Sequence, residues 1–207
     1  MNLVSLLSSG IDSPVATYLL SKHATQIIAV HADTQPFTDK RELANYRKLI
    51  SYLQQQLSLN IKAYIIPHGA ALSAFKQHCN QRFTCVFCKR MLVRYADVIA
   101  RKEHASALIM GDSLGQVASQ TLQNLKTVDQ ATFLPILRPL IGFDKEDIIS
   151  IARKIGTYDL SILPANPCGA VPKQPATQAA VQQLLEEEAK LDIDLLVKNA
   201  ITNPVLL

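Results

Sequence analysis

Short apolar runs alternate with longer mixed segments along most of the chain. Five such runs, each rich in Leu, Ile, Val or Ala, predict buried strands at residues 3–7, 26–31, 61–66, 107–110 and 133–137. The segments around them carry apolar residues at helical spacing and predict helices at residues 14–22, 40–57, 84–102, 117–125 and 145–155. Strands that alternate with helices form parallel sheets covered on both faces. We therefore predict an α/β fold, Rossmann-like and doubly wound, around a mostly parallel five-stranded sheet.

The pattern changes after Gly156. Prolines at positions 164, 167, 172 and 175 indicate a loop, and residues 177–191 then predict a helix rich in Glu and Gln. We expect residues 1–175 to form one domain. Residues 176–207 are expected to be a C-terminal helical extension of that domain, either an appendage or the arm of a homodimer.

The composition is that of an ordinary globular protein. Of the 207 residues, 48% are hydrophobic and 18% are charged. No apolar run approaches the roughly 20 residues needed to cross a bilayer, and the segment before the first loop is too short for a signal peptide. We therefore expect a cytoplasmic protein that does not contact a membrane. The net charge of +4 is a mild bias, compatible with a polyanionic partner.

The turn after the first predicted strand has the composition of an anion-binding loop. Its residues are Ser8, Ser9, Gly10, Ile11, Asp12 and Ser13. Small residues let backbone N–H groups approach an anion, and the next helix presents its positive end to the same point. Asp12 or Ser13 is expected to cap that helix, and Asp12 could also be a partner for Mg²⁺ and phosphate-bound water. An ordinary strand-to-helix turn with a good cap is the alternative interpretation.

The cysteines are too few for a disulfide scaffold, so metal binding or catalysis is the expected use. Cys85 and Cys88 open a predicted helix and can share one of its faces. Cys168 lies in a Pro-Cys-Gly turn that would expose its thiol, whereas Cys79 is expected to be a buried structural residue. Cys85, Cys88 and Cys168 are therefore candidate metal ligands. A zinc site completed by Cys79 or a histidine, and a redox or persulfide pair, are two uses left open for them.

Longer motifs indicate the protein family to which the chain is similar. The loop resembles the S-G-G-x-D-S loop of PP-loop ATP pyrophosphatases, with Ser9 where that family usually has glycine. If this position requires a positive φ, serine costs about 1 kcal/mol. Residues 111–121 read GDSLGQVASQT, and are followed by LPILRPL at 134–140 and KIGTY at 154–158. Together these motifs resemble the tRNA 4-thiouridine synthases of the ThiI type over nearly the whole chain.

This resemblance implies a PP-loop domain over residues 1–175 and an ATP-dependent sulfurtransferase. It implies cofactor contacts from Leu6, Leu7, Ser8, Ser9, Gly10, Asp12, Ser13, His31, Ala32, Lys89, Gly111 and Gln120. It further implies that Cys168 is the reactive cysteine; we assign it a catalytic role together with Asp12. Gly111 would permit close approach of a ligand ring, Gln120 would satisfy a base or ribose edge, and His31 would act through its backbone. The cofactors are then ATP and Mg²⁺. Some members of the family hold an iron–sulfur cluster on such cysteines, so the resemblance also implies a [4Fe-4S] cluster on Cys85, Cys88 and Cys168 as the third candidate.

The expected reaction is adenylation of a uridine carbonyl oxygen in tRNA, release of pyrophosphate and insertion of sulfur to give 4-thiouridine. The chain begins at the ATPase strand, with neither a THUMP module nor a rhodanese domain, so we expect a separate tRNA-binding protein and a sulfur donor as partners. An enzyme that thiolates a small molecule or forms an amide, and a non-catalytic nucleotide-binding partner of a split thiolation system, are the alternatives. Five basic residues of the helix predicted at 84–102 could line a phosphate track or form a solvated face: Lys89, Arg90, Arg94, Arg101 and Lys102.

Overall fold

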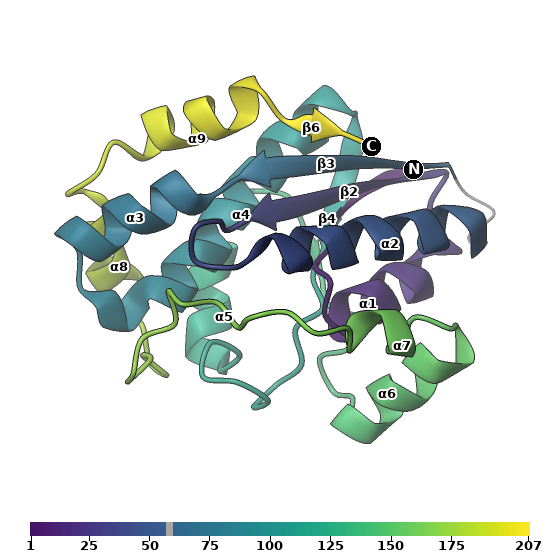
Figure 1. Cartoon of the computed structure of the whole chain (residues 1–207). Coiled ribbons are helices and arrows are strands. Elements are labelled where there is room, and N and C mark those ends of the chain that lie inside the picture. Colours follow the sequence, from purple (N-terminus) through teal and green to yellow (C-terminus); the bar gives the residue numbers. More distant parts are fainter. Residues whose placement is uncertain (57–59) are drawn as a thin grey trace.

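The fold is built on a parallel sheet with helices on both faces. The computed structural model describes residues 1–56 and 60–207 (Figure 1). In this part of the chain the six strands lie in the order β5-β4-β1-β2-β3-β6. Their bounds are Asn2–Leu6 (β1), Gln26–Asp33 (β2), Ile61–Pro67 (β3), Ala105–Ile109 (β4), Ile136–Leu137 (β5) and Val205–Leu206 (β6). The first five correspond to the predicted strands and are all parallel, which confirms the predicted doubly wound α/β fold.

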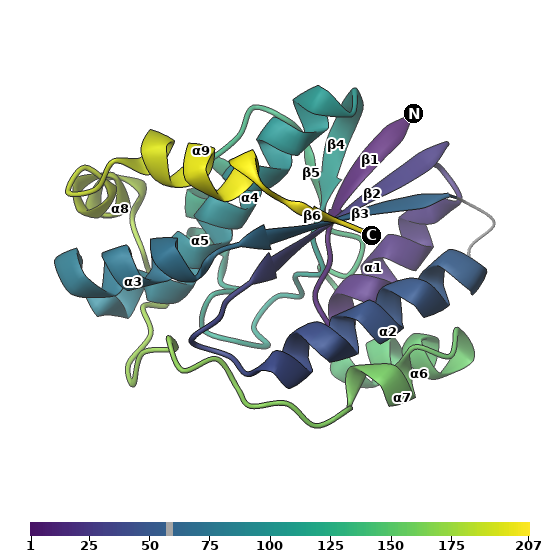
Figure 2. The same cartoon turned by 45° about the horizontal axis from the view of Figure 1, so that its top comes forward.

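Successive residues of each strand point to opposite faces of the sheet, and each face carries its own hydrophobic cluster. One face is covered by α1 (Asp12–Ser21), α2 (Lys40–Gln56), α6 (Lys145–Lys154) and α7 (Tyr158–Ser161). The other is covered by α3 (Gly69–His78), α4 (Thr84–Lys102), α5 (Leu122–Asp129), α8 (Val181–Glu188) and α9 (Ile193–Thr202). Figure 2 shows these two layers on either side of the fanned strands. No helix in the described ranges is both long enough and apolar enough to span a membrane.

Several predicted boundaries were wrong. The helix predicted at 117–125 begins only at Leu122, because the Thr121 side chain accepts a hydrogen bond from the Asn124 amide and caps the helix there. The strand predicted at 133–137 is restricted to β5, and Phe133 is fully exposed. The end of the helix predicted at 40–57 lies outside the described residues. The helix predicted at 84–102 has the bounds of α4.

Some elements were not predicted at all. Helices α3 and α7 and the 3₁₀ turn Gln81–Phe83 occupy segments to which the sequence assigned no element. The C-terminal extension contains α8 and α9 rather than one helix over 177–191. It then returns to the sheet as β6, which pairs antiparallel with β3 through two residue pairs (Tyr64 with Leu206, Ile65 with Val205).

A buried ion-pair network attaches α8 to the rest of the molecule. Arg90 on α4 is 1% exposed, and its guanidinium donates to both carboxylate oxygens of Glu188 at 2.7 and 2.9 Å. Arg94, one turn later, donates to the same two oxygens at 2.9 and 2.6 Å. Burial opposes ionisation of Glu188, but the two guanidinium groups overcome it and hold the pKa of this carboxyl below its ordinary value.

Glu188→Gln should therefore destabilise the fold, because it leaves a buried guanidinium without its counter-charge. We expect the free energy of unfolding to fall by about 3 kcal/mol at neutral pH, measured by urea denaturation. A carboxyl with a lowered folded-state pKa stabilises the fold above its ordinary pKa, and this contribution disappears as the pH falls through the folded-state value. The wild type and Glu188→Gln should therefore have similar free energies of unfolding in acid. Glu186→Gln, at an exposed position of α8, is the matched control and should change stability by less than about 0.5 kcal/mol. Equal stability of the two variants at neutral pH would contradict the assignment.

Candidate nucleotide and thiol site

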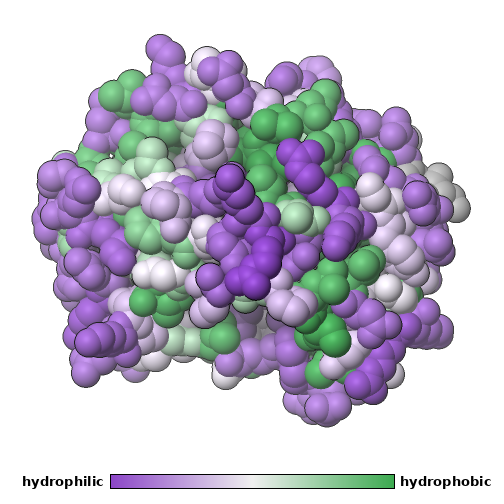
Figure 3. Space-filling view, in the orientation of Figure 1, coloured by the Kyte–Doolittle hydropathy of each residue, from purple (hydrophilic) through white to green (hydrophobic). Residues whose placement is uncertain are grey.

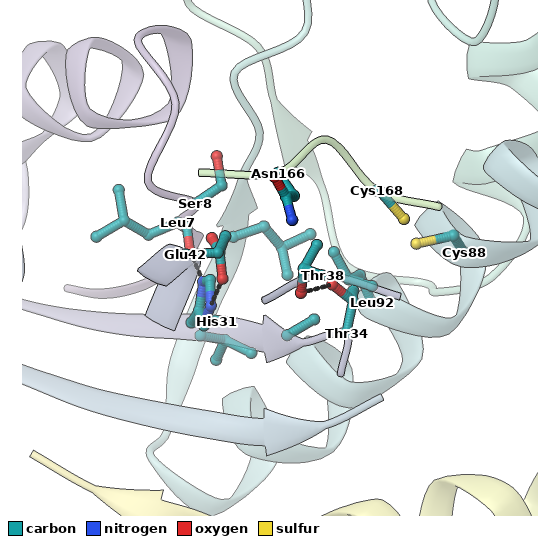
Figure 4. A pocket seen from close by; sticks show the side chains of 13 residues that line it. Leu7, Ser8, His31, Thr34, Thr38, Glu42, Cys88, Leu92, Asn166 and Cys168 are labelled. Atoms are coloured by element: carbon teal, nitrogen blue, oxygen red, sulfur yellow. Dashed lines mark hydrogen bonds and ion pairs between the residues drawn. The ribbon is translucent and has the colours of Figure 1, made fainter. Parts of the chain in front are cut away.

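A cavity of about 310 Å³ lies beyond the carboxyl ends of β1 and β2. Ligands of open parallel α/β sheets bind at this edge. Its lining comes from the two strands, the start of α2, one face of α4 and the proline-rich segment after α7 (Figure 4). The lining residues are Leu6, Leu7, Ser8, Val30, His31, Ala32, Thr34, Thr38, Glu42, Cys88, Leu92, Asn166 and Cys168.

The loop between β1 and α1 leaves the start of α1 without a side-chain cap. The predicted capping by Asp12 or Ser13 is wrong, since the N-cap position is Ile11 and no side chain caps it. The Ser13 hydroxyl is instead turned back into the loop, where it accepts a hydrogen bond from the Ser8 amide at 2.9 Å. Asp12 forms an ion pair with Lys145 of α6 at 2.5 Å. No side-chain hydrogen bond from the described residues therefore caps the first N–H groups of α1, at the positive end of the helix.

Ser9 has no backbone strain. His104 is the non-glycine residue with a positive φ in the described ranges, so the expected penalty at Ser9 does not arise. The Ser9 hydroxyl donates to Glu42 at 3.0 Å, and the other carboxylate oxygen of Glu42 lies 3.2 Å from Nε2 of His31. Burial opposes ionisation of Glu42, yet His31 and Ser9 together hold its pKa below the ordinary value.

The ring of His31 also takes part in the site, contrary to the expectation that only its backbone matters. Its Nδ1 lies 3.1 Å from the carbonyl oxygen of Leu7, and its ring stacks on that of Tyr46 with centroids 3.9 Å apart. The end of β1, the end of β2 and the start of α2 are thus joined by one polar chain that begins at Ser9.

Gly111 lies in close contact with the loop, and its expected contact with a ligand ring stays a prediction. A Cβ at this position would lie 2.8 Å from the backbone nitrogen of Ser13 and 2.9 Å from the carbonyl carbon of Asp12. The neighbouring Asp112 is 3% exposed and accepts from Lys89 at 2.6 Å and from Arg138 at 3.0 Å. Burial alone would raise the pKa of this carboxyl, but the two cations lower it below its ordinary value.

The basic residues of α4 do not form a phosphate track. Lys89 pairs with Asp112, Arg90 and Arg94 pair with Glu188, and Arg101 pairs with Asp97 at 2.5 Å. Lys102 lies over the ring of Tyr64, 5.2 Å from its centroid. The charges of this helix are mostly neutralised within the protein, so neither the phosphate-track interpretation nor a freely solvated face describes them.

The structure brings most of the expected nucleotide contacts together. Leu6, Leu7, Ser8, His31 and Ala32 line the cavity, and Ser9, Gly10, Asp12 and Ser13 continue the loop beside it. Three expected contacts, Lys89, Gly111 and Gln120, are outside the lining. Gln120 is buried, and its side-chain oxygen has no hydrogen-bond partner in the described protein, as for a group that meets a ligand.

Sulfur atoms form the other end of the cavity. Cys88 and Cys168 both line it, and Figure 4 shows their sulfur atoms facing one another across the end of the cavity. Cys85 lies one turn before Cys88 on α4. Burial, and after it the proximity of Cys85 and Cys168, raises the pKa of Cys88 to about 12; burial and Cys168 likewise raise the pKa of Cys85. Cys79 instead donates to the carbonyl oxygen of Glu187 at 3.2 Å.

The three thiols do not form a metal site as they stand. Within residues 1–56 and 60–207, no group of three or more His, Cys, Asp or Glu side chains is arranged to hold a metal ion. Of the thiols that were expected to hold a cluster, Cys88 and Cys168 line the cavity and Cys85 lies one turn away on α4, and they do not complete a ligand set in this arrangement.

Four polar lining residues were missed by the sequence interpretation: Thr34, Thr38, Glu42 and Asn166. The Thr34 and Thr38 hydroxyls are 2.8 Å apart, and the backbone N–H of Asn166 donates to the Asp39 carboxylate. Polar residues directly after the second strand were a usable signal, because that strand ends at the binding edge of the sheet. Asn166 had no such signal, since it reaches the site from a loop far along the chain.

These features define a class of protein: a parallel α/β protein with a serine-rich loop after its first strand and two thiols at the same cavity. The family model described as "Thiamine biosynthesis protein (ThiI)" matches residues 1–193. The chain belongs to this family, which confirms the resemblance of its motifs.

Relatives agree with this membership. The chain is 44% identical over 200 residues to a "Probable tRNA sulfurtransferase" of Methanosarcina mazei, covering 96% of this chain and 49% of the relative. It is 41% identical over 204 residues to a protein of the same name in Finegoldia magna, covering 98% and 52%. The chain thus spans about half the length of these curated relatives.

Solved structures share the fold. A "4-thiouridine synthetase - RNA complex with bound ATP" superposes with a TM-score of 0.94 at 33% identity, covering 100% of this chain and 54% of the other. The NMN synthetase of Francisella tularensis has a TM-score of 0.59 at 15% identity over 96% of this chain and 75% of its own, which shows the fold alone.

Gly111→Ala should weaken the nucleotide site, because its methyl group would displace the backbone at Asp12 and Ser13. We expect the affinity for ATP, measured by titration calorimetry, to fall by at least about tenfold. Gly142→Ala is the matched control, since a Cβ there has nothing within 4 Å, and it should bind ATP as the wild type does. Unchanged affinity in Gly111→Ala would show that the loop tolerates displacement.

Cys88 should react slowly with iodoacetamide at neutral pH, because burial keeps its thiol protonated. The alkylation rate, followed by peptide mass spectrometry, should rise about tenfold per pH unit up to about pH 10 without levelling off, since only the thiolate reacts. The urea-unfolded protein is the internal control and should level off near the ordinary thiol pKa of about 8.5. A plateau at the same pH in the folded protein would contradict the assignment.

Proposed function

We propose that the chain is the ATP-using, sulfur-inserting part of a tRNA sulfurtransferase that makes 4-thiouridine. One observation carries the proposal: the phosphate-binding loop and the two facing thiols lie at opposite ends of one cavity. An enzyme that activates a carbonyl with ATP and then replaces its oxygen by sulfur needs both groups within reach of one atom. The names of the relatives, and the ATP and RNA bound by the structurally similar synthetase, support the same reaction.

The nucleotide would lie with its adenosine against the ends of β1 and β2 and its phosphates at the loop. Leu6, Leu7 and Ala32 supply the apolar surface, while the N–H groups at the start of α1 face the phosphates. Mg²⁺ would accompany the phosphates and take an oxygen ligand from Asp12, which is half-buried beside the loop and now pairs with Lys145. That carboxylate has the oxygen donors that Mg²⁺ prefers.

The reaction has two parts. The uridine O4 attacks the α-phosphorus of ATP, the α–β bridging bond breaks, and pyrophosphate leaves with the negative charge held at the loop. The terminal sulfur of a persulfide on Cys168 then attacks C4, and the C4–O bond breaks to release AMP. The thiolate of an external reductant then attacks the Cys168 sulfur, which frees 4-thiouridine and leaves a mixed disulfide, because burial keeps the neighbouring Cys88 thiol protonated. An external persulfide donor and a thiol reductant restore the starting state.

No step is assigned to an iron–sulfur cluster, because the described thiols do not complete a ligand set. Iron and zinc analysis of the anaerobically purified chain, together with its absorbance spectrum, distinguishes the two sulfur chemistries. A metal-free, colourless protein supports the persulfide mechanism, and a stoichiometric cluster would replace it with the alternative.

Cys168→Ser should separate the two parts of the reaction. We expect ATP binding and tRNA-stimulated pyrophosphate release to stay within about threefold of wild type, because the substituted group acts only after adenylation, while 4-thiouridine formation is lost. Cys79→Ser is the matched control, since Cys79 is outside the cavity lining, and it should retain thiolation. Nucleoside analysis by mass spectrometry measures the product. Unchanged 4-thiouridine in tRNA from cells lacking the gene would refute the proposed function.

A further inference from the structure

Five exposed cations that form no ion pair within the described residues lie on or beside the helices that cover one face of the sheet, although Lys126, Lys173 and Lys198 are exposed without an ion pair elsewhere. Two of the five also lie over aromatic rings: Lys22 over Tyr18 and Arg153 over Tyr158. We call this surface the α2–α6 basic face and define it by Lys22, Arg47, Lys48, Arg153 and Lys154. All five side chains are exposed, and in the part of the chain that the structure describes none takes part in an ion pair. Helices α1, α2, α6 and α7, which carry or adjoin these residues, lie together on one face of the sheet (Figure 2).

Two adjoining hollows shape this face. One has a volume of about 360 Å³ and is lined by Tyr18, Tyr52, Leu53, Gln56, Arg153, Lys154, Ile155 and Gly156. The other, of about 520 Å³, is lined by Arg47, Lys48, Ser51, Tyr52, Gln55 and Leu160. They share Tyr52, whose hydroxyl donates to the carbonyl oxygen of Ile155 at 3.1 Å. Cations, tyrosine rings and amide groups therefore alternate over a continuous hollowed surface, and the molecule is hydrophilic over much of the side seen in Figure 3.

A purely structural use explains only part of this arrangement. Arg153 and Lys154 are in the last turn of α6, where cations offset the negative end of the helix. Arg47 and Lys48 are in the middle of α2, where no such effect acts. The acidic residues of α6, Glu146 and Asp147, are in its first turn, at the opposite end from these cations. Asp159 on α7 is the one carboxylate that follows them closely in the sequence, and it does not balance the charge of the face.

We infer that the α2–α6 basic face binds the phosphate backbone of RNA. Exposed, unpaired cations attract phosphates through counterion release, and tyrosine rings between them suit nucleotides that leave the stack. The face is also continuous with the cavity along α2. Glu42 lines the cavity, and Lys48 and Tyr52 follow it by about 9 and about 15 Å along the helix axis. This inference rests on the proposed function, because it takes the tRNA substrate as its ligand.

The test uses the full chain and bulk tRNA, with affinity measured by filter binding over a series of salt concentrations. The quadruple variant R47Q/K48Q/R153Q/K154Q should bind tRNA at least about tenfold more weakly near 0.1 M salt, and the slope of log K against log salt should decrease by about 3. The variant K102Q/K126Q/K173Q/K198Q is the matched control, because it removes the same charge from four exposed lysines outside the face. It should lose less than about threefold. ATP binding, measured separately, should be unchanged in both.

Equal loss in the two variants would overturn the inference, since it would show a response to net charge alone. If the quadruple variant bound tRNA as tightly as wild type, the inference would also be overturned. If that variant lost binding to an acidic protein and kept binding to RNA, the face would be a protein-binding surface instead. Failure of the inference and failure of the proposed function give different results. A wild-type chain that binds tRNA through this face but forms no 4-thiouridine would refute the proposed function and leave the inference standing. A wild-type chain that forms 4-thiouridine, together with a quadruple variant that binds tRNA as tightly as wild type, would refute the inference and leave the proposed function standing.

Discussion

The backbone of Ser13 lies so close to Gly111 that no side chain fits between them. This contact joins the end of β4 to the start of α1, and so fixes the phosphate-binding loop to the sheet. The next residue, Asp112, extends the same anchor, because Lys89 ties it to the thiol-bearing helix α4 and Arg138 ties it to the segment after β5. Gly111 and Asp112 therefore position both the loop and the thiol-bearing helix. The proposed reaction, in which one carbonyl carbon is first activated by ATP and then attacked by sulfur, would depend on that common reference.

A second polar chain holds the adenosine side of the cavity. Ser9 differs from the glycine of related loops, and the structure shows a use for its hydroxyl: it binds Glu42, which in turn binds His31. The carboxylate stays ionised because its neighbours outweigh the cost of burial. A glycine would leave Glu42 with one partner fewer. The loop does not need the backbone freedom of a glycine at this position. Serine instead provides a side-chain link between the loop and α2.

The parts of the fold that follow from local pattern could be predicted from the sequence. Apolar runs located the five parallel strands, and the helical spacing in residues 84–102 located α4. The failures involve contacts between distant segments. Strand β6 consists of two residues whose only regular pairing is with β3, and Glu188 is 98 residues from its partner Arg90. Asp12 and Ser13 have good capping side chains, yet the tertiary partners of these side chains, Lys145 and Ser8, compete successfully for them. Motifs pointed to the loop and to Cys168, which both reach the cavity, whereas Asn166 reaches it only because the proline-rich segment crosses it.

The same distinction applies to charge. Lysine and arginine positions are visible in the sequence, but their carboxylate partners are not, so α4 seemed to offer a basic track that the structure neutralises. The cations that remain exposed on α2 and α6 are unremarkable in sequence, because they are scattered in two pairs more than 100 residues apart. In the folded protein the cations of α4 are therefore mostly paired, and those pairs on α2 and α6 are exposed. Three cations of α4 hold Asp112 and α8 in place, whereas four cations of α2 and α6 on the other side of the sheet are exposed and form no ion pair in the described part of the chain. A net charge of +4 thus understates the local field, since it averages neutralised and free cations over the whole surface.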